Sequence, residues 1–232
     1  MKKNILVTGS KGQLGSELRE LSEEYQQYNF SFTSKSELDI TQKPEVEDFL
    51  TSHRINVIIN CAAYTAVDKA EEDFELADKI NHTGVKHLAE IAKKAAIQLI
   101  HISTDYVFNG ENFKPYGEND PTSPVNKYGQ TKLAGEESII EAKLNNSMII
   151  RTSWVYSSYG NNFVKTMLKL GNERDELKVV NDQIGTPTYA RDLAEFILKN
   201  CIEIEHHGLE TYHYTNEGVC SWYDFAVEIM HL

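Results

Sequence analysis

Short apolar runs recur along the chain, and amphipathic segments of about helix length separate them. The central runs are apolar at both odd and even positions, which is typical of strands that helices cover on both faces. We therefore expect seven strands, over residues 4–9, 29–33, 55–63, 97–104, 147–154, 177–180 and 211–215.

The segments between these runs carry apolar residues at helical spacing. Leu14, Leu18 and Leu21 repeat in this way early in the chain, and a second apolar stripe runs through residues 72–96. The pattern predicts helices over residues 15–21, 72–96, 163–170 and 221–232, with a further one opening near Tyr128.

Strands that alternate with helices indicate βαβ units and a mostly parallel sheet. We expect an α/β fold, Rossmann-like and doubly wound, with a small C-terminal substrate lobe. The predicted division is a dinucleotide-binding domain over residues 1–152 and a lobe over 153–232 that includes a returning strand. The last segment is helical and meets no stop signal, so we expect a chain truncated at its C-terminus, with impaired substrate binding and an intact cofactor site.

Charge and cysteine usage exclude several classes of protein. The net charge is −12 without a basic run, which argues against nucleic acid or an anionic membrane as partner. Three widely spaced cysteines form neither a disulfide framework nor a zinc motif. No apolar run reaches the length of a membrane span, and we expect a cytoplasmic protein. Neither His82 with His87 nor the pair at 206–207 has metal-ligand spacing, so no metal is predicted.

The first strand leads into a glycine-rich turn, Gly9-x-x-Gly12-x-x-Gly15, and then a helix. Gly9 permits a tight turn, Gly12 lets the backbone approach a pyrophosphate, and Gly15 allows close packing of helix on strand. Free N–H groups at the helix N-terminus then face the anion. The motif predicts a dinucleotide site.

The end of the second strand indicates which cofactor is used. An acid there would bind the ribose 2′-hydroxyl and favour NAD. This strand end has no carboxylate, and Ser34 and Lys35 suit a 2′-phosphate. We therefore expect NADPH, with NADH as the alternative.

Tyr128 and Lys132 lie one helical turn apart, but with 12 Tyr and 18 Lys in 232 residues chance supplies about one such pair. The position of this pair in the chain is what indicates a catalytic role. Thr104 ends the fourth strand, at the edge where ligands of open α/β sheets bind, and Tyr128 follows 24 residues later. A phenol is a slow proton donor unless a nearby ammonium lowers its pKa, and a threonine hydroxyl can polarise a substrate oxygen. The three residues predict a reductase site.

The chain resembles the extended short-chain dehydrogenase/reductase superfamily and, within it, the dTDP-4-dehydrorhamnose reductase family. The resemblance covers essentially the whole chain. It is carried by "TGSKGQLG", "NCAAYTAVDKAE", "STDYVFNG", "NKYGQTKLAGE", "RTSWVYSSYGNNFVKTML" and "VVNDQIGTPTYARDLA", in this order.

This resemblance implies NAD(P)H-dependent reduction of the C4 keto group of dTDP-4-dehydro-6-deoxy-L-mannose to give dTDP-L-rhamnose. Tyr128 would donate the proton, Lys132 would activate it, and Thr104 would tune it. The cofactor would contact these two helix residues together with Gly9, Gly12, Gln13, Leu14, Asp39, Ile40, Ala63, Tyr64 and Thr65. The dTDP-linked 4-keto-6-deoxysugar would contact Val67, Thr104, Asp105, Trp154 and Asn162.

Two other functions stay open at this point. A nucleotide-sugar dehydratase or epimerase is the nearest, although the dehydratases need a second acid after Thr104-Asp105 and this chain has Tyr106. The other is a non-catalytic cofactor-binding subunit, like the regulatory subunit of methionine adenosyltransferase, which shares the fold. A homodimer is the default expectation for the oligomeric state.

Overall fold

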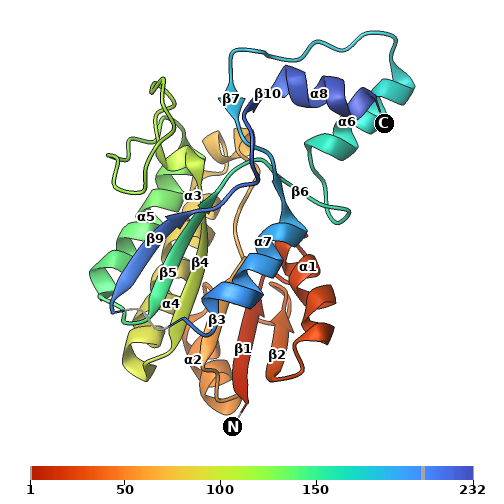
Figure 1. The fold of residues 1–232 in the computed structure, drawn as a ribbon. Coiled ribbons are helices and arrows are strands. Elements are labelled where there is room, and N and C mark those ends of the chain that lie inside the picture. Colours follow the sequence, from red (N-terminus) through yellow and green to blue (C-terminus); the bar gives the residue numbers. More distant parts are fainter. Residues whose placement is uncertain (1, 205–206, 232) are drawn as a thin grey trace.

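The computed structural model describes residues 2–204 and 207–231. Within these residues a six-stranded sheet has the order β2-β1-β3-β4-β5-β9, and every neighbouring pair is parallel (Figure 1). The strands are β1 (Lys3–Thr8), β2 (Tyr28–Thr33), β3 (Val57–Asn60), β4 (Gln98–Thr104), β5 (Ser147–Thr152) and β9 (Leu209–His213). The expected parallel α/β fold is confirmed.

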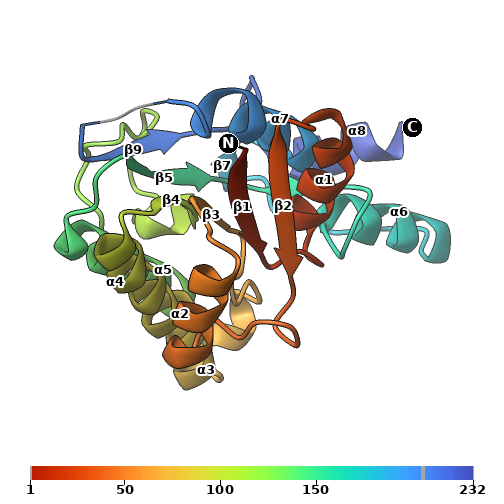
Figure 2. The ribbon, with the colours of Figure 1, turned by 90° about the horizontal axis from the view of Figure 1, so that it is seen from below.

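The sheet separates two helical layers, which Figure 2 shows from below. The side chains of β1 divide between them, because Ile5 and Val7 belong to one buried cluster and Leu6 to the other. This is why the central strands are apolar at both parities. One face carries α1 (Gln13–Leu21) and α7 (Ala190–Phe196), and the other carries α2 (Lys43–Ser52), α4 (Val85–Ala95) and α5 (Lys127–Ala142).

The predicted stripe of α1 is buried as expected, with Leu14, Leu18 and Leu21 in the core. The helix predicted over 72–96 is interrupted instead. Its first part is α3 (Phe74–Asp78), and a π-helical turn (Lys79–Gly84) joins it to α4. The turn buries Asn81, whose side chain accepts a hydrogen bond from Tyr64 N (2.8 Å) and donates to Tyr64 O (3.1 Å). The π turn therefore fixes the segment that follows β3.

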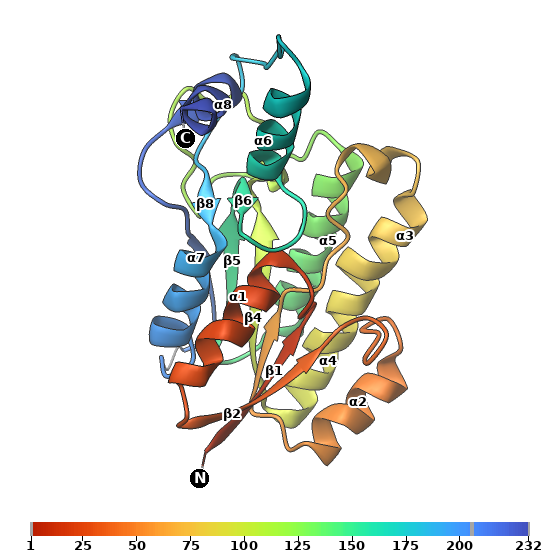
Figure 3. The same cartoon turned by 90° about the vertical axis from the view of Figure 1, so that its right-hand side faces the viewer.

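A smaller layer of structure lies beyond the carboxyl ends of the strands (Figure 3). It contains α6 (Phe163–Glu173), α8 (Trp222–Met230) and two small sheets that pair β6 (Val155–Tyr156) with β8 (Thr188–Tyr189) and β7 (Ile184–Gly185) with β10 (Cys220–Ser221). A capping box between Ser221 and Asp224 starts α8. The small core of this layer is formed by Met167, Ala226 and Ile229.

The strand expected over 177–180 is wrong, because this segment has no regular secondary structure. Leu177 and Val179 are apolar because they pack beside α6 and α8, while Val180 is 51% exposed. A run of four residues is too short for its pattern to separate a strand from a packed loop.

The segment predicted over 211–215 contributes to β9, which follows α7 and pairs with β5 at the edge of the main sheet. The division into domains at residue 152 stays a prediction. Over residues 2–204 and 207–231, every helix is too short or too polar to cross a lipid bilayer.

Candidate active site at the sheet's carboxyl edge

A cleft of about 830 Å³ lies at the carboxyl edge of the sheet. From β1 the chain turns outward to β2 and then crosses back to β3 on the other side, so β1 and β3 form a topological switch point. Ligands of open α/β folds bind at this point. The loops after β1, β3, β4 and β5 line the cleft together with Trp222 from the lobe.

The glycine turn forms one end of the cleft. Gly9 has φ +64°, and a Cβ there would lie 2.6 Å from the backbone of Cys61 and Ala62. A Cβ on Gly15 would lie 2.5 Å from Gly9 O. Helix α1 then begins after Gly12 without a side-chain cap and without an acid in its first turn. Its free N–H groups suit a pyrophosphate, so the residues present fit a dinucleotide.

Side chains also connect this turn to the lobe. Gln13 donates to Val155 O (3.2 Å) and accepts from Asn162 Nδ2 (2.9 Å). One turn further along α1, buried Glu17 accepts from Ser157 Oγ (2.5 Å). The helix that opens the cofactor site and the 155–162 segment are therefore held as one unit.

At the end of β2, Ser34 and Lys35 line the cleft as the sequence suggested, but the hydroxyl of Ser34 is engaged. Ser34 N and Oγ both donate to Glu37 Oε2, at 2.8 and 2.6 Å. Hydrogen bonding from Ser34 lowers the pKa of Glu37. The carboxylate of Glu37 therefore lies beside the expected 2′-phosphate position, although the end of the strand itself has no acid. The Ser-x-x-Glu spacing of Ser34 and Glu37 was the signal for it in the sequence.

Nearby, Asp39 and Ile40 line the same end of the cleft. Burial alone would raise the pKa of Asp39, but hydrogen bonds from Thr41 and the charges of Lys35 and Lys79 lower it. Asp39 is thus an ionised acceptor.

The predicted catalytic residues meet in the cleft. Thr104 ends β4, while Tyr128 and Lys132 lie on consecutive turns of α5, which Asn126 caps through a bond from Gly129 N (2.7 Å). Tyr128 is 8% exposed and Lys132 1%. Lys132 Nζ donates to Ile102 O at 2.7 Å.

The expected lowering of the Tyr128 pKa is wrong for this arrangement. Burial raises the pKa of Tyr128, and the charges of Asp105 and Tyr106 raise it further, while a hydrogen bond with Thr104 lowers it. Burial also lowers the pKa of Lys132 to about 8. Loss of water is the largest cause of both shifts, and it disfavours the phenolate and the ammonium alike.

Asp105 follows Thr104 and accepts a hydrogen bond from its hydroxyl (3.0 Å). Burial raises the pKa of Asp105 to about 6, although hydrogen bonds from Thr104 and the backbone oppose this. A carboxyl group that titrates so near neutrality, inside a cleft, is typical of functional sites.

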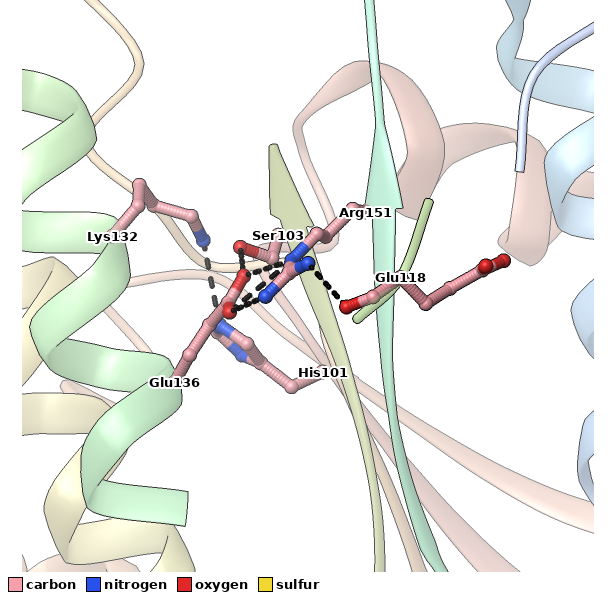
Figure 4. A network of polar contacts seen from close by, with 6 residues as sticks. All are labelled: His101, Ser103, Glu118, Lys132, Glu136 and Arg151. Atoms are coloured by element: carbon pink, nitrogen blue, oxygen red, sulfur yellow. Dashed lines mark hydrogen bonds and ion pairs between the residues drawn. The ribbon is translucent and has the colours of Figure 1, made fainter. Parts of the chain in front are cut away.

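A buried ion pair stands behind Lys132 (Figure 4). Glu136, one turn further along α5, accepts from Arg151 Nη2 (2.7 Å) and Nε (3.1 and 3.2 Å) and from the Ser103 hydroxyl. Arg151 also donates to Glu118 O (3.2 Å). The pair links α5 to β4 and β5 and fixes the helix face that carries Tyr128 and Lys132.

Two tryptophans form the wall on the lobe side. The rings of Trp154 and Trp222 stack with centroids 3.6 Å apart at 13°, and Phe163 backs Trp222 at 4.5 Å. Trp154 has the left-handed φ of 47°, which is uncommon for a bulky residue. Both rings line the cleft and offer it an aromatic surface.

The comparisons with known proteins agree with this geometry. The model of the RmlD substrate binding domain family matches residues 1–232. The dTDP-4-dehydrorhamnose reductase of Aggregatibacter actinomycetemcomitans is 44% identical over 228 residues, which are 97% of this chain and 77% of the relative.

The chain belongs to the RmlD substrate binding domain family. Two solved structures are also similar. A dTDP-4-dehydrorhamnose reductase from Clostridium acetobutylicum has a TM-score of 0.92 at 48% identity, covering 98% of this chain and 79% of its own. The enzyme from Bacillus anthracis, in complex with NADP, has a TM-score of 0.92 at 44% identity, covering 99% and 81%.

Most residues expected from the family resemblance line the cleft of this RmlD-family chain. They are Gly9, Gly12, Gln13, Leu14, Asp39, Ile40, Ala63, Thr65, Val67, Thr104, Asp105, Tyr128, Lys132 and Trp154. Their individual roles stay predictions.

Tyr64 and Asn162 do not line it. The hydroxyl of Tyr64 donates to Asp73 (3.0 Å), and Asn162 caps α6 by accepting from Lys165 N (3.0 Å). For Asn162, the signal of a helix cap was an Asn directly before the apolar pair Phe163-Val164.

Sequence reasoning did not name Trp222 as a site residue, although it lines the cleft of this RmlD-family chain. Only the pairing of β10 with β7 brings it there, and the aromatic start of a helix carries no local signal for this role. Among the described residues, no three His, Cys, Asp or Glu are grouped so as to hold a metal ion. Of the histidine pair at 206–207, residue 206 lies outside the described residues.

Proposed function

We propose that this chain is an NADPH-dependent reductase that converts the C4 keto group of dTDP-4-dehydrorhamnose to the hydroxyl of dTDP-L-rhamnose. The observation that carries the proposal is the meeting of Thr104, Tyr128 and Lys132 beside the glycine turn at the β1–β3 switch point. The names of the similar proteins point to the same substrate, and one of them was solved with NADP.

In this proposal the N-terminus of α1 and the backbone of Gly12 hold the pyrophosphate. Ser34 and Lys35 face the adenosine 2′-phosphate. NADPH, when bound, supplies the hydride. The Trp154–Trp222 wall closes the opposite end of the cleft on the sugar nucleotide and excludes water from it.

The hydroxyls of Thr104 and Tyr128 bind the C4 oxygen and polarise the carbonyl. Tyr128 then gives that oxygen its proton. Burial, which raises the pKa of Tyr128, keeps the phenol protonated at neutral pH, as a donor in the reductive direction must be. Lys132 replaces the proton on Tyr128, and its pKa of about 8 makes it a donor matched to neutral pH.

The two alternative functions have weaker support. The position of the second dehydratase acid is filled by Tyr106, whose ring lies edge-on to Tyr128 at 5.6 Å and 79°. A non-catalytic cofactor-binding subunit has no need of a polar catalytic face that is this deeply buried.

Mixing the protein with NADPH and dTDP-4-dehydrorhamnose tests the proposal. We expect loss of the NADPH absorbance in equal amount to dTDP-L-rhamnose formed, and little reaction with the GDP-linked analogue. A sugar product formed without net NADPH consumption contradicts the proposal and identifies a dehydratase or epimerase. No turnover of any sugar, with tight NADPH binding, favours a regulatory subunit.

Two further expectations stay predictions. The cytoplasmic location follows from composition alone, and a homodimer follows from base rates alone. Sedimentation velocity at micromolar concentration distinguishes monomer from dimer.

A further inference from the structure

A line of four polar side chains crosses the sheet beneath the cleft. Thr8, Asn60 and His101 come from the adjacent strands β1, β3 and β4, where Thr8 pairs in register with Asn60 and Asn60 with His101. Lys132 reaches the end of the line from α5. All four are 0–1% exposed. Figure 4 shows His101 and Lys132 facing one another.

The neighbours of these residues along the strands are apolar. Val7, Ile59 and Ile100 precede Thr8, Asn60 and His101, and each of the three is fully buried. Burying polar groups in such a core costs free energy unless every donor and acceptor is matched. The matching of donors and acceptors along the line therefore indicates which atom carries the proton at each contact.

The line has a direction that a backbone group sets. The N–H of Ala62, which can only donate, points to Thr8 Oγ1 at 3.4 Å. The hydroxyl of Thr8 in turn donates to Asn60 Oδ1 at 2.6 Å. This leaves the amide nitrogen of Asn60 facing His101 Nδ1 at 2.9 Å, so Nδ1 is the acceptor.

A neutral imidazole carries one N–H, and His101 is neutral, because burial and the charge of Lys132 lower its pKa well below the usual value. With Nδ1 accepting from Asn60, the proton sits on Nε2. That atom is 3.4 Å from Lys132 Nζ. An Nε2–H group matches the lone pair of a lysine amine and opposes an ammonium.

Other groups act on Lys132 from every side. On α5, Glu136 favours the ammonium, although Arg151 and Ser103 already bind this carboxylate. At the end of β3, burial raises the pKa of the half-buried Cys61 thiol to about 12, so this group is uncharged near neutral pH and does not offset Glu136. Tyr128 lies one turn away, with Asp105 beyond it. Against these, His101 is the partner that favours the amine.

We propose that the hydrogen-bond chain anchored at Ala62 N–H holds His101 as the Nε2–H tautomer, and that His101 is thereby a positioning residue that assists proton release from Lys132 to Tyr128. This rests on the proposed reductase function. His101 touches neither substrate nor cofactor and acts only through Nζ.

The proton transfers balance as follows. The O–H bond of Tyr128 breaks as a new O–H bond forms on the reduced sugar oxygen. An N–H bond of the Lys132 ammonium then breaks to restore the phenol. The remaining amine donates to Ile102 O and accepts from His101 Nε2–H, and a proton from solvent restores the ammonium before the next turnover.

The tautomer can be measured without any enzyme assay. Long-range ¹H–¹⁵N correlation spectra of the ¹⁵N-histidine protein report which imidazole nitrogen carries the proton. We expect a neutral His101 protonated at Nε2, assigned by the signal that His101→Gln removes. If that variant does not fold, substituting the other histidines in turn gives the assignment. A proton on Nδ1, or an imidazolium, overturns the proposal.

Thr8 gives the functional test, because it lies outside the cleft and can lose its hydroxyl without change of shape or charge. In Thr8→Val the amide of Asn60 no longer has a fixed orientation, so the opposite tautomer becomes populated and the ammonium of Lys132 gains an acceptor. In the proposed mechanism reductase activity needs that ammonium, so we expect activity to fall as pH rises through about 8. We expect this basic limb to move upward by about half a pH unit in Thr8→Val.

Thr8→Ser is the matched control, since it keeps the hydroxyl, and we expect the wild-type limb. If both variants lose stability or turnover without any movement of the limb, the role of the line is only structural and the proposal is overturned. If the wild type reduces no sugar, the proposed function fails, whereas the tautomer measurement still decides the state of His101.

Discussion

The two ends of the cleft are built in different ways. At the cofactor end, the glycine turn comes from one continuous stretch, Gly9–Gly15, which runs from β1 into α1. The substrate end depends on Trp154 and Trp222, which are far apart in sequence and meet only because β7 pairs with β10 and β6 with β8. Between them lie the groups of β4 and α5 to which we assign the chemistry.

This difference has energetic consequences. The cofactor end uses backbone N–H groups that any strand–turn–helix would leave free, so it costs little stability. The centre of the cleft instead holds buried Tyr128 and Lys132 and half-buried Asp105, and loss of water moves the pKa of each toward the neutral form. Stability is thus given up for reactivity at the centre and not at the glycine turn.

The largest effect is expected at Tyr128, where a substitution should change turnover but not cofactor binding. Tyr128→Phe removes the proton donor, and turnover should fall by about 10²–10⁴-fold while NADPH affinity stays unchanged. Single-turnover kinetics and NADPH fluorescence titration measure the two quantities. Tyr116→Phe, outside the cleft, is the control. Undiminished turnover in Tyr128→Phe contradicts the assignment of Tyr128.

Asp105 tests the cost of the buried centre. Because its folded pKa of about 6 exceeds the ordinary value, the folded state is destabilised when the carboxyl is ionised, above pH 6, and this cost disappears as pH falls toward 4. At pH 7, Asp105→Asn should therefore raise the free energy of unfolding, measured by urea denaturation, by up to about 3 kcal/mol. At pH 4 it should show no gain. An equal gain at both pH values would exclude titration of Asp105 as the cause.

The aromatic wall tests the substrate end alone. Trp222→Ala should raise KM for the sugar nucleotide by about tenfold, because the stacked surface is lost, and leave the Kd of NADPH unchanged. Trp222→Phe should restore most of the loss, and Tyr223→Ala, next in sequence and outside the cleft, should behave as wild type. A parallel loss of NADPH affinity would show that the two ends are not independent.

The smallest effect concerns cofactor choice. Lys35→Ala should lower the preference for NADPH over NADH, and Glu37→Gln should raise it by removing a negative charge from beside Ser34. Each change should be about threefold, as expected for exposed charges. Ratios of kcat/KM for the two cofactors measure it. A change of the same sign in both variants is inconsistent with a 2′-phosphate at this position.

The sequence by itself determined the parallel α/β fold, the glycine turn, and the order Thr104, Tyr128, Lys132. These depend on local periodicity and on the rule that ligands bind at the carboxyl ends of strands. It misjudged residues 177–180, because four apolar residues do not distinguish a strand from a loop that packs on helices.

Only the tertiary structure decided the rest. Glu37 meets Ser34, Tyr64 and Asn162 turn to other partners, and Trp222 joins Trp154 through contacts that no local pattern encodes. The direction of the Tyr128 pKa and the line from Thr8 to Lys132 have the same origin. Both depend on burial and on the register of neighbouring strands, which arise when distant segments pack and water is excluded between them.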